Sequence, residues 1–92
     1  MDFQIKCVDL DKSSYFRDCR RIKSIGILAQ GGGTNKYTPA QIYDRIKGGE
    51  KFFVSNNNQR VYLIEVKRGE TKYVRTEPND TENDNLLKQD SC

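Results

Sequence analysis

The 92-residue sequence contains no histidine and no tryptophan, only two prolines, and no long apolar run. Without histidine, the usual general base for a serine or cysteine nucleophile is missing, and no other residue is marked as its replacement. We therefore expect a protein that is not an enzyme, with no catalytic residues and no cofactor. No segment approaches the ~18 consecutive apolar residues of a membrane span, and residues 1–10 lack the pattern of a secretory signal. The sequence thus predicts a cytoplasmic protein with no membrane association.

Cysteine is also scarce, and the three cysteines, Cys7, Cys19 and Cys92, stand far apart. In a reducing compartment such cysteines are most simply unlinked thiols. A structural zinc site needs closely spaced ligand pairs such as C-x-x-C, usually with histidine, and the sequence has neither, so we predict no metal site. Cys19 precedes two arginines and is the candidate for a reactive thiol, although burial as a small apolar residue is the commoner role.

The net charge of +3 hides an uneven distribution along the chain. Residues 1–76 carry 15 Lys+Arg against 8 Asp+Glu, a net charge of +7, whereas residues 77–92 carry one lysine against five acids, or −4. This division fits a solvated surface with a solubilising tail, and it also fits a basic face for an anionic partner. We predict one domain over residues 1–76 and an acidic, partly disordered tail over residues 77–92. Within this tail we expect Leu86 and Leu87 to dock on the body.

Strand patterns occur on both sides of a well-marked helix. The predicted strands cover residues 2–10, 20–29, 51–55, 59–67 and 70–76. Gly26, inside the second strand, indicates a bulge or a close approach. These elements predict an α+β fold, with a small, mostly antiparallel sheet and one short helix in the order β-β-α-β-β-β.

The helix over residues 39–47 has clear signals at both ends. Thr38 and Gln41 have the spacing of a capping box, and Pro39 falls at the first helical position, where its missing N–H costs nothing. Residues 48–49 are both glycine and supply a left-handed stop. Because the helix is short, it needs a sheet to pack against.

The last two predicted strands, residues 59–67 and 70–76, form a hairpin whose register can be predicted from the residues that would face each other. With residues 68–69 as a two-residue loop, Glu65 faces Lys72, which pairs opposite charges. Ile64 then faces Tyr73, and each such pair is worth about 0.2–1 kcal/mol. Both faces of this hairpin are apolar at mid-strand, and one short helix cannot cover both. We therefore expect the N-terminal strands or another subunit to cover the second face, and we predict a homo-oligomer.

Three consecutive glycines, residues 31–33, precede the helix and raise the question of a phosphate-binding loop. The Walker pattern G-x-x-x-x-G-K-[ST] is absent, and Lys36 stands where the dinucleotide pattern G-x-G-x-x-G needs its third glycine. Thr38 also satisfies helix N–H groups that a phosphate would need. We interpret the run as a hinge of slack chain. A weaker possibility, in which its backbone N–H groups close over a small anion beside Lys36, stays open.

The order of the motifs "GGG", "YTPAQIYDRIKGGEKFFV", "VYLIEV", "KYVRT" and "DNLLKQDSC" resembles a family of small bacterial and phage domains catalogued as domain of unknown function 3892. The resemblance covers residues 22–92. This sequence departs from the family pattern at Tyr37, where tryptophan is frequent, and at Gln89 and Asp90, where a Leu-Pro pair is common. The resemblance implies a compact α+β domain of β-β-α-β-β-β order and supplies no activity or functional residues.

The composition favours a non-catalytic binding module for an anionic ligand, either nucleic acid or a phosphate-bearing nucleotide. The candidate anion contacts are the basic residues Arg20, Arg21, Lys23, Lys36, Arg60 and Arg75. Tyr62 and Tyr73 share a predicted hairpin face with Arg75 and could stack on a base, although core packing is the commoner role of aromatic residues. The alternative is a protein-interaction or assembly module, an accessory or phage factor acting on a host protein through strand-edge pairing or a symmetric dimer.

Overall fold

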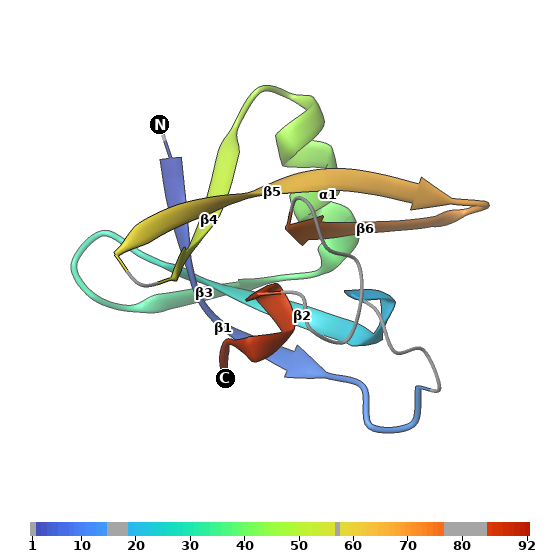
Figure 1. The fold of residues 1–92 in the computed structure, drawn as a ribbon, viewed down its shortest axis with the longest axis horizontal. Helices are drawn as coiled ribbons and strands as arrows, with labels where there is room; N and C mark the ends of the chain where they lie inside the picture. The colour runs from blue at the N-terminus through green and yellow to red at the C-terminus, as the bar shows by residue number, and fades with distance from the viewer. Residues whose placement is uncertain (1, 15–18, 57, 77–84) are drawn as a thin grey trace.

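The computed structural model describes residues 2–14, 19–56, 58–76 and 85–92. Over these residues the chain forms seven strands, one α-helix and two short 3-10 helices (Figure 1). The elements are β1 (Asp2–Leu10), η1 (Cys19–Arg21), β2 (Ile22–Leu28), β3 (Thr34–Tyr37), α1 (Pro39–Lys47), β4 (Lys51–Asn56), β5 (Gln59–Arg68), β6 (Thr71–Thr76), η2 (Asn85–Lys88) and β7 (Asp90–Ser91). The predicted order is found, but β3 and β7 come in addition to it. The fold is therefore richer in strand than the predicted α+β class.

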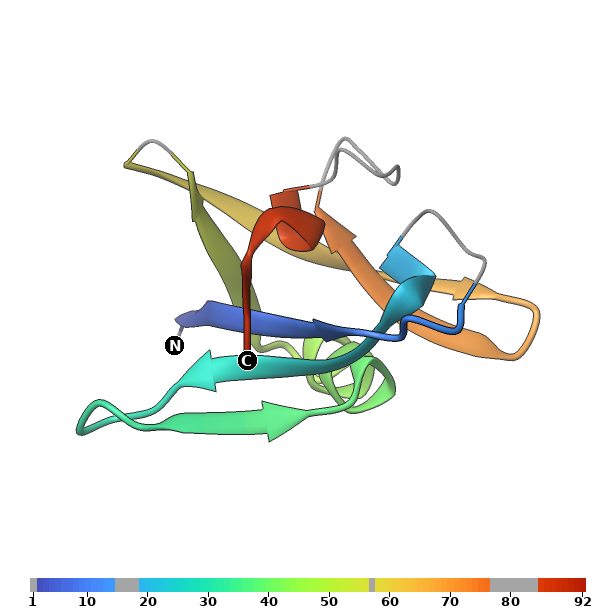
Figure 2. The same ribbon diagram turned by 90° about the horizontal axis from the view of Figure 1, so that it is seen from below.

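The strands lie in the order β3-β2-β1-β4-β5-β6, and β7 pairs with β1 outside this path. The pairs β1–β4 and β1–β7 are parallel, whereas the neighbouring pairs β1–β2, β2–β3, β4–β5 and β5–β6 are antiparallel. The sheet is strongly curled (Figure 2): β3, β2 and β1 form one arm, β5 and β6 form the other, and β4 joins the two.

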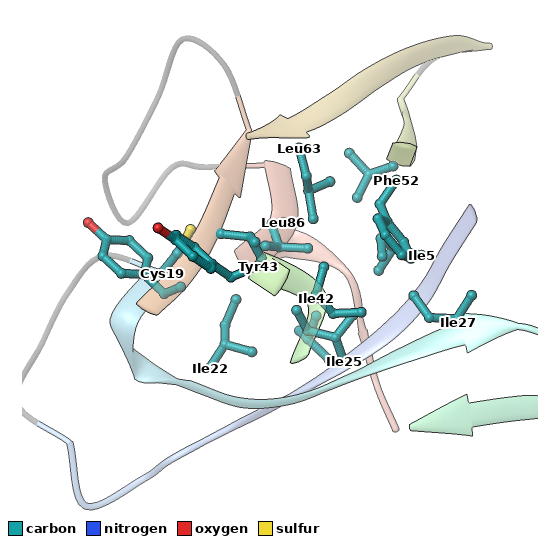
Figure 3. Packing of buried hydrophobic residues seen from close by; sticks show 14 residues of the cluster. Ile5, Cys19, Ile22, Ile25, Ile27, Ile42, Tyr43, Phe52, Leu63 and Leu86 are labelled. Carbon is teal, nitrogen blue, oxygen red and sulfur yellow. The ribbon is translucent and has the colours of Figure 1, made fainter. Parts of the chain in front are cut away.

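The hydrophobic core lies between the two arms (Figure 3). Ile5, Ile25 and Ile27 project into it from the first arm, and Leu63 projects from β5. The helix contributes Ile42, and β4 contributes Phe52. Leu86 of η2 is fully buried among them, and Leu87 packs against the same cluster. The C-terminal segment thus supplies part of the core, while residues 77–84 of the predicted acidic tail lie outside the described residues.

The two ends of α1 follow the sequence signals. The Thr38 hydroxyl accepts a hydrogen bond of 3.2 Å from the Gln41 N–H, and Gln41 Oε1 accepts one of 2.8 Å from the Thr38 N–H. Pro39 is the first helical residue. Gly48 is the C-cap, and Gly49 follows with a φ of 105°. The predicted capping box and glycine stop are confirmed.

The three glycines form a hairpin turn, so their interpretation as slack chain is wrong. β2 and β3 pair as antiparallel strands on either side of the run. The Ala29 N–H donates to the Gly33 carbonyl at 2.8 Å, and the Gly32 N–H donates to the Ala29 carbonyl at 3.1 Å. Gly31 and Gly32 have φ values of 91° and 97°, a region that favours glycine. Backbone geometry in this turn therefore accounts for the glycines.

The register of the β5–β6 hairpin differs by two residues from the predicted one. Glu65 faces Val74 and not Lys72, and the turn consists of Gly69 and Glu70. Gly69 has a φ of 60° at the first turn position, which suits glycine in a tight hairpin. A shift of two residues leaves every side chain on the same face, so the apolar pattern could not distinguish the two registers.

Both faces of this hairpin are covered within the chain. Tyr73 and Val74, which point to opposite faces, are each 1% exposed. Helix α1 packs on β5 and β6, while η1 and η2 lie against β6. The hairpin therefore needs no second subunit for its burial, and self-association stays a prediction. Among the described residues, the large apolar side chains that remain exposed are Leu28 at 42% and Tyr62 at 40%.

Cys7 and Cys92 form a disulfide, so the prediction of three unlinked thiols is wrong for these two residues. Their Cα atoms are 5.0 Å apart although the residues are separated by 85 positions. Such a separation carries no pairing signal in the sequence, because only the tertiary structure brings β1 beside the C-terminal segment. Cys19 stands outside the disulfide and is buried, which matches the commoner of its two predicted roles.

The disulfide lies directly against the backbone of Gly26, which confirms the predicted close approach. A Cβ at this position would overlap Cys7 Sγ and lie 3.0 Å from Cys92 Sγ. We predict that Gly26→Ala prevents or strains the disulfide and lowers stability towards urea, since closing so long a loop contributes about 4 kcal/mol. Thiol titration of the denatured protein and urea unfolding measure the two effects.

The matched control for this prediction is Gly48→Ala. A Cβ there would lie 3.4 Å from its nearest neighbour, and the φ of Gly48 is −79°, which alanine adopts readily. This variant should keep both the disulfide and the urea midpoint. A Gly26→Ala protein with an intact disulfide and an unchanged midpoint would contradict the prediction.

Candidate functional site

A groove of about 830 Å³ opens between the start of β1, the β2–β3 hairpin, α1 and the β4–β5 hairpin. This volume lies within the usual range for small-molecule sites. Its aromatic and basic lining consists of Phe3, Tyr37, Arg45, Phe53 and Arg60. Gln4, Gln30, Asn35 and the carboxylate of Asp2 add polar groups. The groove therefore combines rings, cations and amides contributed by five different elements and one turn.

Arg45 of α1 lies among aromatic rings at one wall of the groove. Its guanidinium carbon is 4.9 Å from the ring centroids of both Phe3 and Tyr37, and 5.0 Å from that of Phe52. Glu50 holds the same group with two hydrogen bonds, 2.9 Å from Nε and 2.7 Å from Nη2. These bonds raise the pKa of Arg45 and lower the pKa of Glu50. Arg45 is thus an oriented, permanently charged group.

Arg60 of β5 is the second cation of the groove and is much more open to solvent. Its side chain is 59% exposed, and its guanidinium carbon lies 4.4 Å from the ring centroid of Phe53. Its Nη1 is 3.5 Å from Asp2 Oδ2, which also accepts a 2.7 Å hydrogen bond from the Tyr62 hydroxyl. Exposed ion pairs of this kind are weak, so another anion can replace Asp2 beside Arg60 at little cost.

Of the six basic residues predicted to contact an anion, Arg60 lines the groove. The others are distributed over other elements: Arg20 and Arg21 in η1, Lys23 on β2, Lys36 on β3, and Arg75 on β6. Lys36 Nζ lies 3.1 Å from Asp9 Oδ2, where hydrogen bonds from Ser24 and Lys36 lower the pKa of Asp9. Of the six, Arg60 alone lines the groove, and a shared anion-binding surface of the other five stays a prediction.

The two tyrosines predicted to stack on a base have different environments. Tyr73 is buried in the core at 1% exposure, so its ring has no face open to a base and core packing is its role. Tyr62 is exposed, and its hydroxyl binds Asp2 next to Arg60. Of this pair, only Tyr62 remains a candidate for ligand contact.

Sequence analysis assigned no ligand contact to four residues that line the groove: Arg45, Phe3, Tyr37 and Phe53. For Arg45 the available signal was its position relative to Glu50: the two opposite charges flank the glycine stop of the helix. The aromatic rings around them come from strands on both sides of the helix in the sequence. They meet only because the sheet curls, which no local pattern encodes.

Fold and groove together define a small domain with a mostly antiparallel sheet and a short helix. A family model described as "Protein of unknown function (DUF3892)" matches residues 4–88, and the chain belongs to this family. No curated protein and no solved structure matches the chain. Within the described part of the chain, no helix has the length and apolar character needed to cross a membrane.

The Arg45–Glu50 pair makes stability depend on pH in the acid range. Because the pKa of Glu50 is lower in the folded than in the unfolded protein, its contribution is present above the ordinary glutamate pKa and is lost as the pH falls through the folded-state value. We expect the urea midpoint to fall on acidification, and to fall less steeply in Glu50→Gln.

Asp9 and Asp11 also have lowered pKa values and contribute to the same fall in stability. The contribution of Glu50 is therefore the difference between the wild type and Glu50→Gln in the slope of the urea midpoint against pH. Glu70→Gln, in the exposed turn between β5 and β6, removes a carboxylate without touching Arg45 and should keep the wild-type slope. A Glu50→Gln slope equal to that of the wild type would show that the pair does not stabilise the fold.

Proposed function

We propose that the protein is a non-catalytic binding module for an anionic ligand that carries an aromatic base, a nucleotide or a single nucleic-acid strand. The observation that supports this proposal is the placing of guanidinium groups against rings in the groove. The guanidinium carbon of Arg45 lies 4.9 Å from the ring centroids of Phe3 and Tyr37, and that of Arg60 lies 4.4 Å from the ring centroid of Phe53.

The chemistry of such a lining suits nucleotides for three reasons. Aromatic faces and guanidinium planes both stack on bases, and stacking contributes about 1–3 kcal/mol per base. Guanidinium groups donate charge-assisted hydrogen bonds to phosphate. The amide side chains of Gln30 and Asn35, at the β2–β3 hairpin, can both donate to and accept from base edges.

Asp2 limits the affinity that the groove can offer. Its carboxylate is 3.5 Å from Arg60, so a ligand phosphate competes with it for the same guanidinium. The net charge of +7 over residues 1–76 attracts polyanions at longer range and partly offsets this local competition. We therefore expect binding that is moderate and that weakens steeply with salt.

Substitutions of Arg60 and Asp2 should shift binding in opposite directions. Fluorescence anisotropy with a labelled single-stranded oligonucleotide, at about 50 and about 200 mM salt, measures the affinity. Arg60→Gln should weaken binding by about tenfold, as expected for the loss of one charge-assisted hydrogen bond. Asp2→Asn should strengthen it by about three- to fivefold, because a like charge near the phosphate is removed.

The control is Arg68→Gln on the same strand. Arg68 stands at the other end of β5, about 26 Å from Arg60 at ~3.3 Å per residue, and its substitution changes the net charge equally. This variant should bind within about twofold of the wild type, because it leaves the groove intact. Equal losses in the two arginine variants would indicate unspecific attraction and reject the groove, and a wild type that binds nothing at the lower salt would reject the function.

Protein binding is the second candidate function, and Leu28 is the observation that favours it. Leu28 lines the groove and is 42% exposed, so the groove also offers an apolar contact. Salt separates the two functions, since binding to an apolar side chain persists at salt concentrations that release a nucleic acid.

A further inference from the structure

The C-terminal segment, residues 85–92, completes the pairing of β1 at one place in the sheet. β2 occupies one edge of β1 along residues 5–10. The other edge is shared: β4 pairs with residues 2–4, and β7 pairs with Cys7 and Val8. In Figure 2 the red segment runs from η2, between the two arms, down to β1. Its removal would leave the backbone of β1 unpaired on this side.

Core packing, strand pairing and a covalent bond all hold the segment in place, and they differ in strength. Leu86 is buried in the core. The backbone pairing is short: the two residues of β7 pair with Cys7 and Val8, and beyond β7 the Cys92 N–H donates to the Val8 carbonyl at 3.3 Å. The third interaction is the covalent bond between Cys92 and Cys7. A two-residue pairing opens easily unless something tethers it, and the disulfide is that tether.

We propose that the Cys7–Cys92 disulfide is a redox-controlled latch. In the oxidised protein it holds residues 85–92 on β1. In the reduced protein the segment leaves, which exposes the β1 edge at Cys7 and Val8 together with the site that Leu86 occupied.

The opening step is a two-electron reduction by a dithiol. Its thiolate attacks Cys92 Sγ, the S–S bond breaks, and Cys7 leaves as a thiolate that takes up a proton. The second thiol of the reductant then attacks the mixed disulfide, which releases the Cys92 thiol and leaves the reductant as a disulfide. The structure favours attack at Cys92, because Cys92 is exposed whereas Cys7 is buried.

The remaining strand pairings of the fold do not involve the segment, so they can stay formed when it leaves. The pairs β1–β2, β1–β4, β4–β5 and β5–β6 are formed entirely by residues 2–76. The same holds for the capping interactions of α1. Disulfides persist in oxidising surroundings and are reduced in reducing ones. The attachment of residues 85–92 to β1 would therefore depend on the redox state around the protein.

Hydrogen–deuterium exchange of the full chain, with and without a dithiol, tests the latch. On reduction, amides of residues 85–92 and of Val8, whose backbone groups face β7, should exchange at least about tenfold faster, while those of α1 and β5 stay unchanged. Cys92→Ser should show the fast exchange without reductant and should not respond to the dithiol. This variant separates the loss of the disulfide from any other effect of the reagent.

Three results would overturn the proposal. Unchanged exchange of residues 85–92 after reduction would show that the other contacts suffice to hold the segment. Loss of protection in α1 on reduction, or in Cys92→Ser, would show that the disulfide maintains the whole fold and does not control one segment. Absence of the Cys7–Cys92 bond from the oxidised protein, checked by mass spectrometry of peptides, would remove its basis.

Discussion

The strand β1 is the constraint on which the rest of the structure depends, because its two edges have different partners. One edge pairs with β2, and the other is divided between β4 and β7. Parallel pairing of β1 with β4 requires a crossover connection, and β2, β3 and α1 provide it. This path positions α1, and with it Arg45, beside the start of β1. The groove exists because of that crossover.

A register shift within the β1–β2 pair contributes to the curl of the sheet. The pairing changes between Ile5 and Cys7, so that β1 carries an extra residue there. Bulges of this kind bend a strand and increase its twist. The shift also sets Cys7 opposite Gly26, where the absence of a side chain makes room for the disulfide. One local irregularity thus influences the core, the groove and the attachment of the C-terminal segment.

The positive charge of the chain is less available than its composition suggests. Several lysines and arginines form ion pairs with carboxylates: Lys36 with Asp9, Arg45 with Glu50, Arg60 with Asp2, and Lys72 with Asp44. Binding of an anion therefore depends on which of these cations can release its carboxylate and pair with the ligand, and not on net charge alone. Arg60 is the most exposed cation among them, whereas Arg45 is fixed by two hydrogen bonds. This difference suits Arg60 to ligand contact and Arg45 to shaping the wall of the groove.

The sequence by itself determined the features that depend on residues close together in the chain. The capping box joins Thr38 to Gln41, and the glycine stop follows directly after the helix, so both could be predicted with the order of most elements. The β5–β6 register could not, because a two-residue shift preserves both faces and only the turn at Gly69 selects between the alternatives. The tertiary structure alone decided the Cys7–Cys92 bond and the contact of Arg45 with the aromatic rings of Phe3, Tyr37 and Phe52. These features join segments that are distant in the chain, and their proximity results from the curl of the sheet, a property of the whole fold that no local pattern records.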